Sequence, residues 1–126
     1  MKSYGQVLIV DDSSTSRMII QRCIQMAGIE VADYLFAENG LDAIAALKAR
    51  ASIEMVVTDI NMPKMDGRTF ATLVRGDPAM AGIGIVVVSS IADSALEAEL
   101  RSLGVLAVVK KPVSPAKMLQ ALGGEP

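Results

Sequence analysis

Five short apolar runs, each followed by a helical pattern, constrain the fold of this chain more than any other feature of its sequence. The runs are Gln6–Val10, Val31–Ala37, Met55–Thr58, Ile83–Val88 and Val105–Val109. Strands that read as continuous apolar runs are buried on both faces, which is typical of a parallel sheet between two layers of helices. Right-handed crossovers of this length favour an open sheet. The sequence therefore predicts an α/β fold, a (βα)5 doubly wound five-stranded parallel sheet.

The predicted helices follow the runs, at about 13–28, 41–50, 70–76, 96–104 and 115–122. Residues 13–15 offer hydroxyls that can cap the first helix. Cys23, the only cysteine, falls in its apolar pattern, which predicts a small core residue and excludes an intrachain disulfide. Asn39 and Asp66, each followed by glycine, are predicted turn residues. A length of 126 residues fits a single domain over residues 1–126, with a core at about 5–122.

Charge and composition exclude several functions. The formal net charge is −2 and no basic run is present, which argues against nucleic-acid binding. No apolar run approaches the roughly 20 residues of a membrane span, and residues 1–6 lack the layout of a signal peptide. With the single cysteine, these features predict a cytoplasmic location. The chain has no histidine, so it cannot itself carry a phosphohistidine.

Chemically active residue types stand directly after four of the five predicted strands. Asp11 and Asp12 follow the first strand, Asp59 the third, Ser89 the fourth and Lys111 the fifth. Ligands of such sheets bind beyond the carboxyl ends of the strands. A cluster of carboxylates without Cys or His favours Mg²⁺, and a carboxylate can form an aspartyl-phosphate. A lysine and a hydroxyl supply the charge and donors that phosphoryl oxygens need.

With these residues in place, the sequence resembles the response-regulator receiver family, particularly its single-domain CheY-like chemotaxis members. The resemblance covers nearly the whole chain. It rests on the motifs Val10–Ser14, Ala37–Gly40, Asp59–Gly67, Val88–Ser90 and Lys111–Pro112. The family has a flavodoxin-like fold, so the resemblance implies the strand order 2-1-3-4-5, for which CheY is itself a standard example.

The resemblance implies a metal site with Mg²⁺ as the cofactor. By position in the motifs, Asp12 and Asp59 are the expected direct ligands of the ion. Asn61 is expected to contribute its backbone carbonyl. Asp11 is expected to act beside them through a water molecule. All four positions match the family pattern in this sequence.

The resemblance also implies how the phosphoryl group is held. Asp59 is the expected phosphoacceptor, Lys111 the cation that pairs with the phosphoryl group, and Ser89 its hydrogen-bond donor. The Lys111–Pro112 peptide bond is expected to be cis, although an X–Pro bond has only about a 5–6% prior chance of that. Lys110 is interpreted as a solvated neighbour, because consecutive strand residues face opposite sides.

The expected function is a phosphorylation-dependent switch of a two-component system. The donor would be a phosphohistidine of a sensor kinase or a histidine phosphotransfer domain. Phosphorylation would shift the face formed by residues 90–122, on the fourth helix, fifth strand and fifth helix, toward a protein target. The chain would be a monomer or a phosphorylation-dependent dimer, and not an enzyme acting on an external substrate. It would be a stand-alone regulator or a receiver cut from a larger regulator or hybrid kinase.

Three residues depart from the family pattern. Val108 stands where many members have an aromatic residue that moves inward on activation, and Ser90 replaces a more usual alanine. Ser89 stands where threonine is common, but it retains the hydroxyl. A receiver that only binds partners therefore stays an alternative. A flavin-binding electron-transfer protein shares the fold class, but Asp11 and Asp12 would repel the flavin phosphate. A phosphohydrolase typically needs an acid two residues after its nucleophile, where this chain has Asn61.

Overall fold

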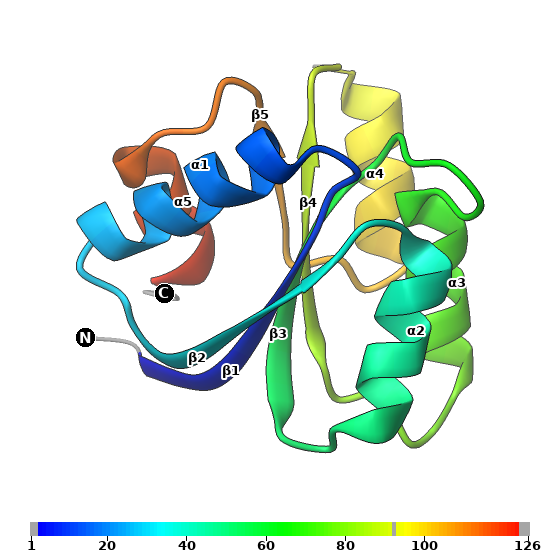
Figure 1. The fold of residues 1–126 in the computed structure, drawn as a ribbon. Coiled ribbons are helices and arrows are strands. Elements are labelled where there is room, and N and C mark those ends of the chain that lie inside the picture. Colours follow the sequence, from blue (N-terminus) through cyan, green and yellow to red (C-terminus); the bar gives the residue numbers. More distant parts are fainter. Residues whose placement is uncertain (1–2, 92, 124–126) are drawn as a thin grey trace.

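The computed structural model describes residues 3–91 and 93–123, and in it a central sheet lies between two layers of helices (Figure 1). The strands are β1 Ser3–Val10, β2 Glu30–Ala37, β3 Ile53–Asp59, β4 Gly84–Ser89 and β5 Ala107–Lys110. The helices are α1 Ser14–Met26, α2 Gly40–Ala49, α3 Gly67–Gly76, α4 Ser94–Ser102 and α5 Pro115–Leu122. Strand and helix alternate along the chain from β1 to α5, as predicted.

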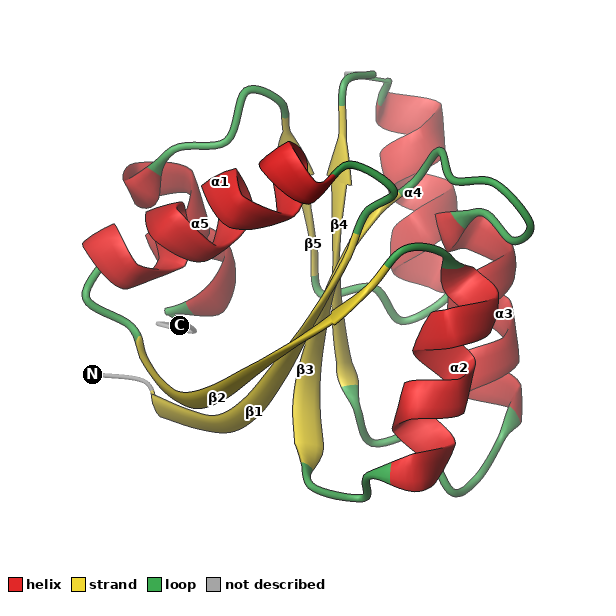
Figure 2. Ribbon diagram, in the orientation of Figure 1, coloured by secondary structure: helices red, strands yellow, loops and turns green. Residues whose placement is uncertain are grey.

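The sheet has the order β2-β1-β3-β4-β5, and every neighbouring pair is parallel. This confirms the predicted doubly wound topology. The helices divide between the two faces: α1 and α5 cover one, while α2, α3 and α4 cover the other (Figure 2). The carboxyl ends of the strands all point to the same edge of the sheet, at the top of Figure 1.

Side chains alternate between the two faces and form two aliphatic cores. Val7, Ile9 and Val57 pack with α1 and α5, and Cys23 belongs to this core with 8% of its surface exposed. Leu8 and Val56 pack with the other three helices. Residues next to one another in a strand point to opposite faces, and both faces are covered here, so the buried segments 7–10 of β1 and 55–57 of β3 are apolar throughout.

Each of the five strands differs from its predicted bounds by one to three residues at one end or both. β1 begins at Ser3 instead of Gln6, because Ser3 and Tyr4 pair with the start of β2. β5 begins at Ala107 instead of Val105, since the amide of Val105 donates to the carbonyl of Leu100 and closes the end of α4. The apolar pattern of the sequence predicts neither the pairing of Ser3 and Tyr4 with β2 nor the hydrogen bond of Val105 to α4.

Asn39 and Asp66 are N-caps and not merely turn residues. The side chain of Asn39 accepts a hydrogen bond from the amide of Asp42 at the start of α2. Asp66 accepts from the amide of Thr69 at the start of α3, so that helix begins at Gly67, inside the segment predicted as loop. At α1 the predicted cap is confirmed, and it is Ser13.

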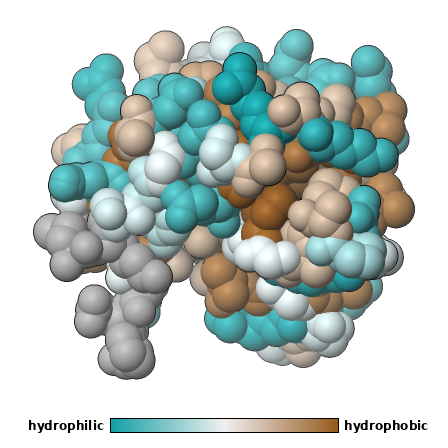
Figure 3. Space-filling view, turned by 90° about the horizontal axis from the view of Figure 1, so that it is seen from below, coloured by the Kyte–Doolittle hydropathy of each residue, from teal (hydrophilic) through white to brown (hydrophobic). Residues whose placement is uncertain are grey.

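The lower face of the molecule, away from the carboxyl ends of the strands, mixes hydrophilic and hydrophobic residues (Figure 3). Exposed hydrophobic residues lie near the middle and toward the right of this view, with hydrophilic ones among and around them. Within the described ranges, each helix is too short or too polar to traverse a bilayer.

Candidate functional site

Three carboxylates converge at the carboxyl edge of the sheet. Asp11 and Asp12 directly follow β1, and Asp59 is the last residue of β3, the strand beside it. One oxygen from each carboxylate can be chosen so that all three lie within 4.8 Å of one another. Asp11 is 1% exposed and Asp59 is 8% exposed, whereas Asp12 is exposed to solvent. The predicted acid cluster therefore exists, with two carboxylates buried in the protein interior and one at the surface.

Asp11 is held on both carboxylate oxygens by the beginning of α1. Its Oδ1 accepts from the amide of Ser13 at 3.0 Å, and its Oδ2 accepts from the hydroxyl of Ser16 at 2.6 Å. The Arg17 guanidinium donates to the carbonyl of Asp11 at 2.7 Å. The loop after β1 and the first turn of α1 thus form one connected unit.

Asp59 is buried beside the ammonium group of Lys111. Its Oδ1 accepts from the amide of Ile60 at 2.9 Å and lies 3.5 Å from Nζ of Lys111. Burial raises the pKa of Asp59, and the negative charge of Asp11 raises it further. Lys111 and the Ile60 amide act in the opposite direction without cancelling the effect. The carboxylate is consequently less stable here than in water, which favours reaction with an electrophile or neutralisation by a cation.

Lys111 lies between the two buried acids. Its Nζ is 3.7 Å from Oδ2 of Asp11 and 3.5 Å from Oδ1 of Asp59. Its amide donates to the carbonyl of Ser89 at 2.8 Å, which ties the end of β5 to the end of β4. The Lys111–Pro112 bond is cis, as expected. Lys110 is exposed, so the interpretation of Lys111 as the inward-facing lysine is confirmed.

Ser89 ends β4 and is fully buried. Its hydroxyl oxygen accepts from the amide of Ile91 at 3.0 Å, which leaves its hydrogen available for donation. Ser90 is exposed. Val108 is half-buried and packs against the core beneath α2, α3 and α4. Asn61 is exposed in the loop after β3.

The loop after β3 returns close to Asp59, and two glycines make that approach possible. A Cβ on Gly67 would lie 2.7 Å from the carbonyl oxygen of Asp59, and one on Gly40 would lie 2.7 Å from Cγ of Met65. The amide of Gly67 donates to the carbonyl of Ile60 at 2.8 Å. Sequence reasoning assigned these glycines to turns and missed the close approach. It also missed the contacts of Ser16 and Arg17 with Asp11.

The donor set fits a hard divalent cation. The cluster of Asp11, Asp12 and Asp59 offers oxygen atoms alone. Mg²⁺ prefers oxygen ligands and commonly binds through one or two carboxylates together with water. The exposed side of Asp12 gives such an ion a path from solvent. The acid cluster can therefore bind a metal ion.

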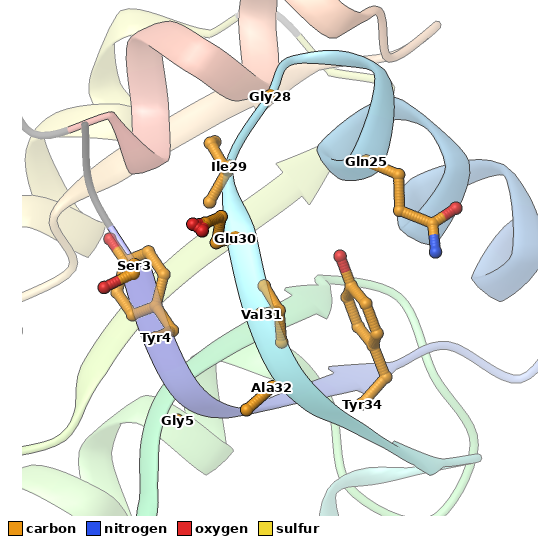
Figure 4. Close-up of a pocket in the computed structure, with 10 residues that line it drawn as sticks. All are labelled: Ser3, Tyr4, Gly5, Gln25, Gly28, Ile29, Glu30, Val31, Ala32 and Tyr34. Carbon is orange, nitrogen blue, oxygen red and sulfur yellow. The ribbon is translucent and has the colours of Figure 1, made fainter.

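A hollow lies at the other end of the sheet, between the start of β1, the start of β2 and the end of α1 (Figure 4). Tyr4, Gln25, Glu30 and Tyr34 contribute to its lining. The hydroxyl of Tyr34 is buried and has no hydrogen-bond partner among the described residues. Burial raises the pKa of Tyr34. Among the described residues that line this hollow, Glu30 alone carries a charge, in contrast to the acids and the lysine at the carboxyl edge.

Comparisons with known proteins agree with this geometry. The sequence model of the response regulator receiver domain matches residues 7–123. The chemotaxis protein CheY1 of Helicobacter pylori is 34% identical over 117 residues, which cover 93% of each chain. The chemotaxis response regulator CheY4 of Vibrio cholerae superposes with a TM-score of 0.80 at 28% identity, covering 95% of this chain and 97% of that one. A chain of the CheX–CheY–BeF3–Mg²⁺ complex of Borrelia burgdorferi gives a TM-score of 0.81 at 28% identity, over 93% and 85% of the two chains.

Proposed function

We propose that Asp59 of this chain, which belongs to the response regulator receiver family, is the residue that accepts the phosphoryl group. Receivers of this family are phosphoacceptor switches in two-component signalling. The observation that carries the assignment is the position of Asp59. It ends the central strand β3, is 8% exposed, and lies 3.5 Å from Lys111 and within 4.8 Å of two other acids. The proposed receiver unit spans residues 1–126.

The proposed reaction is a transfer from a phosphohistidine of a kinase or a phosphotransfer domain. A carboxylate oxygen of Asp59 attacks the phosphorus atom, and a P–O bond forms while the P–N bond breaks. The electron pair of the broken bond returns to the imidazole nitrogen, which takes up a proton from water. The product is an acyl phosphate on Asp59. The raised pKa of Asp59 fits this role, because burial makes the ionised carboxylate more reactive than one in water.

We infer that the metal is Mg²⁺, held directly by Asp12 and Asp59 and by the backbone carbonyl of Asn61, with Asp11 acting through water. When bound, the ion supplies positive charge for the phosphoryl oxygens. The all-oxygen donor set supports this choice. The Mg²⁺ named in the complex of the similar Borrelia burgdorferi protein also supports it.

Lys111 and Ser89 are proposed to detect the new group. Lys111 pairs with Asp59 before the reaction, so its ammonium is in place to neutralise charge added there. The Ser89 hydroxyl accepts one hydrogen bond and retains its own hydrogen for donation to a phosphoryl oxygen. Both residues are joined through the bond from the Lys111 amide to the Ser89 carbonyl. A movement at the carboxyl end of β4 is therefore transmitted to the carboxyl end of β5, and the reverse.

The output is proposed to be a shift of the face formed by residues 90–122, which follows β4 and includes α4, β5 and α5. Phosphorylation would bias this face toward an arrangement that binds a protein target. Val108 is aliphatic and half-buried, so the shift would proceed without an aromatic side chain at that position. The chain is proposed to assist its own phosphorylation and dephosphorylation without being a turnover enzyme on an external substrate. No observation favours a flavin, whose phosphate the acids after β1 would repel.

Intact-mass measurement after incubation with acetyl phosphate tests the assignment of Asp59. The expected result for the wild-type protein is a single phosphoryl adduct that requires Mg²⁺. Asp59→Asn should form no adduct, whereas Asp33→Asn, a matched change of an exposed acid on β2, should behave as wild type. An adduct of normal yield on Asp59→Asn would overturn the assignment.

A further inference from the structure

We propose that Ser16 is a positioning residue of the phosphorylation site, which fixes the carboxylate of Asp11 so that its free acceptor sites face the metal ion. The inference rests on the proposed function of the site. It concerns a residue outside the motifs that carry the family resemblance. The observation behind it is the hydrogen bond of 2.6 Å from the Ser16 hydroxyl to Oδ2 of Asp11.

The bond is short and joins a neutral donor to a carboxylate that is 1% exposed. An ionised carboxylate only accepts hydrogen bonds, so the hydroxyl of Ser16 must be the donor. Charge-assisted O–H···O⁻ bonds have lengths of about 2.5–2.7 Å and are roughly twice as strong as neutral ones. Ser16 is therefore a strong partner of a buried carboxylate that proteins rarely leave unpaired.

Both oxygens of Asp11 have to be held for its orientation to be defined. Oδ1 is fixed by the amide of Ser13 at 3.0 Å. A single hydrogen bond still tolerates some rotation of the carboxyl group about its Cβ–Cγ bond, because hydrogen-bond angles cover a broad range. The Ser16 hydroxyl adds the second point and thereby fixes the plane of the carboxylate.

Ser16 is itself held firmly. It lies in the first turn of α1, and its amide donates to the hydroxyl of Ser13, the N-cap, at 3.2 Å. The adjacent Arg17 guanidinium donates to the carbonyl of Asp11 at 2.7 Å. The helix start and the loop that carries Asp11 are thus connected at several points, and the donor reaches Asp11 from a rigid element, as a positioning group should.

The bond also affects Lys111. The same Oδ2 of Asp11 lies 3.7 Å from Nζ of Lys111, which is 3.5 Å from Asp59. With Ser16 occupying one acceptor site of Oδ2, the ammonium stays between the two acids and within reach of Asp59. Without the hydroxyl, the expected change is a movement of Lys111 toward Asp11. Asp11 would then be less available to the water molecule that links it to the metal.

Calorimetric titration with Mg²⁺ in the absence of a phosphodonor tests the inference on four proteins: wild type, Ser16→Ala, Ser16→Thr and Ser14→Ala. Groups that orient ligands of a metal typically contribute about 10- to 100-fold to its affinity. For Ser16→Ala we expect the dissociation constant of Mg²⁺ to rise about tenfold, the lower end of that range. Ser16→Thr keeps the hydroxyl and should restore the affinity to within about twofold of wild type. Ser14→Ala removes an exposed hydroxyl from the same turn and should leave the affinity unchanged.

A purely structural role gives a different pattern. Ser16→Ala would then lower the urea midpoint of unfolding while the folded protein bound Mg²⁺ as tightly as wild type, and that result overturns the inference. Failure of Ser16→Thr, while folded, to restore the affinity lost in Ser16→Ala would do the same. Should Ser16→Ala fail to fold, Ser16→Cys tests the same point, because a thiol is a weak donor in place of the hydroxyl.

Phosphorylation by acetyl phosphate separates this inference from the proposed function. Ser16→Ala should need about tenfold more Mg²⁺ for half-maximal labelling and approach the wild-type rate at saturating Mg²⁺. A wild-type protein that binds Mg²⁺ but is never labelled would overturn the phosphoacceptor role and leave the positioning role supported by calorimetry alone. A wild-type protein that binds no Mg²⁺ would overturn both.

Discussion

The two ends of the sheet differ in whether their buried polar groups have hydrogen-bond partners. Within the described residues, the buried polar and charged side chains gather at or near the carboxyl end, and each has a partner. They are Asp11, Asn39, Thr58, Asp59 and Ser89. At the amino end, the hollow lined by Tyr4 and Tyr34 holds a buried hydroxyl with no partner (Figure 4).

The difference shows what marks a functional site in this fold. A hollow in the surface does not by itself indicate a functional site. Among the described residues that line the hollow at the amino end, Glu30 alone is charged. At the carboxyl end, strands from separate parts of the sequence place three acids within 4.8 Å of one another. A cation lies 3.5 Å and 3.7 Å from the two buried acids, which are already held by amides and a hydroxyl. Groups fixed in advance act on a reacting phosphoryl group without having to reorganise. Convergent and satisfied polar groups, rather than volume, therefore identify the site.

The largest expected effect of breaking this arrangement comes from Gly67→Ala. The new Cβ would lie 2.7 Å from the carbonyl oxygen of Asp59 and 3.0 Å from Cα of Ile60. Both are backbone atoms at the site and cannot turn aside. We expect the free energy of unfolding to fall by about 1–3 kcal/mol, as in other overpacked sites. Labelling by acetyl phosphate should slow as well, because Asp59 must shift.

Gly76→Ala is the matched control in the same helix. No atom lies within 4 Å of a Cβ added at Gly76, and its φ is not positive. Alanine is favoured over glycine in helices by up to about 1 kcal/mol, so Gly76→Ala should leave the protein as stable as wild type or more so. Equal free energies of unfolding for the two variants, measured in urea, would show that the approach of α3 to Asp59 is not tight.

A smaller effect, with a defined pH dependence, is expected when Asp59 loses its charge. The pKa of Asp59 is raised in the folded state, mainly by burial, so ionisation of this group opposes folding. At a pH below the pKa that Asp59 has in the unfolded chain, the carboxyl is protonated in both states and does not lower the free energy of unfolding. The unfavourable contribution develops as the pH rises from the unfolded-state pKa to the higher folded-state pKa, and it stays constant above that. Asp59→Asn should therefore be more stable than wild type at pH 7 without Mg²⁺, by on the order of 1 kcal/mol.

The comparison of pH 7 with pH 3 in urea titrations checks the sign. The advantage of Asp59→Asn should shrink as the pH falls, since the wild-type carboxyl becomes neutral. Addition of Mg²⁺ at pH 7 should also remove it, because an ion at 100 times its dissociation constant stabilises the native state by about 2.7 kcal/mol. An advantage that persists unchanged at low pH would mean that burial of the charge is not its cause.

The fold and most of the site could be predicted from the sequence, because both follow from strand ends. Apolar runs located the five strands, and Asp59, Ser89 and Lys111 stand directly at their carboxyl ends. The position of these residues at the ends of predicted strands was therefore enough to identify the candidate site. The strand order came from the family resemblance and not from the apolar pattern, which contains nothing that distinguishes one parallel order from another.

What could not be predicted depends on distances between segments. The contact of Ser16 with Asp11 depends on the angle at which α1 leaves the sheet. The need for glycine at position 67 depends on how the loop returns to Asp59. Asn39 and Asp66 favour turns and helix caps almost equally, so their sequence context did not separate the two. Each of these features becomes visible only when the backbone is in place.

The smallest expected effect separates the two tyrosines at the amino end. The hydroxyl of Tyr34 is buried without a partner in the described structure, whereas that of Tyr4 donates to the carbonyl of Leu122 at 2.7 Å. Removing an unpaired buried hydroxyl relieves its desolvation, so Tyr34→Phe should raise the free energy of unfolding by about 0.5 kcal/mol. Tyr4→Phe removes a hydrogen bond and should lower the free energy of unfolding by about 1 kcal/mol.

Urea unfolding at one pH measures the stability of both variants, and neither variant should change labelling of Asp59. A loss of stability in Tyr34→Phe equal to that in Tyr4→Phe would show that Tyr34 has a partner, and the contrast between the two ends would then be one of charge alone.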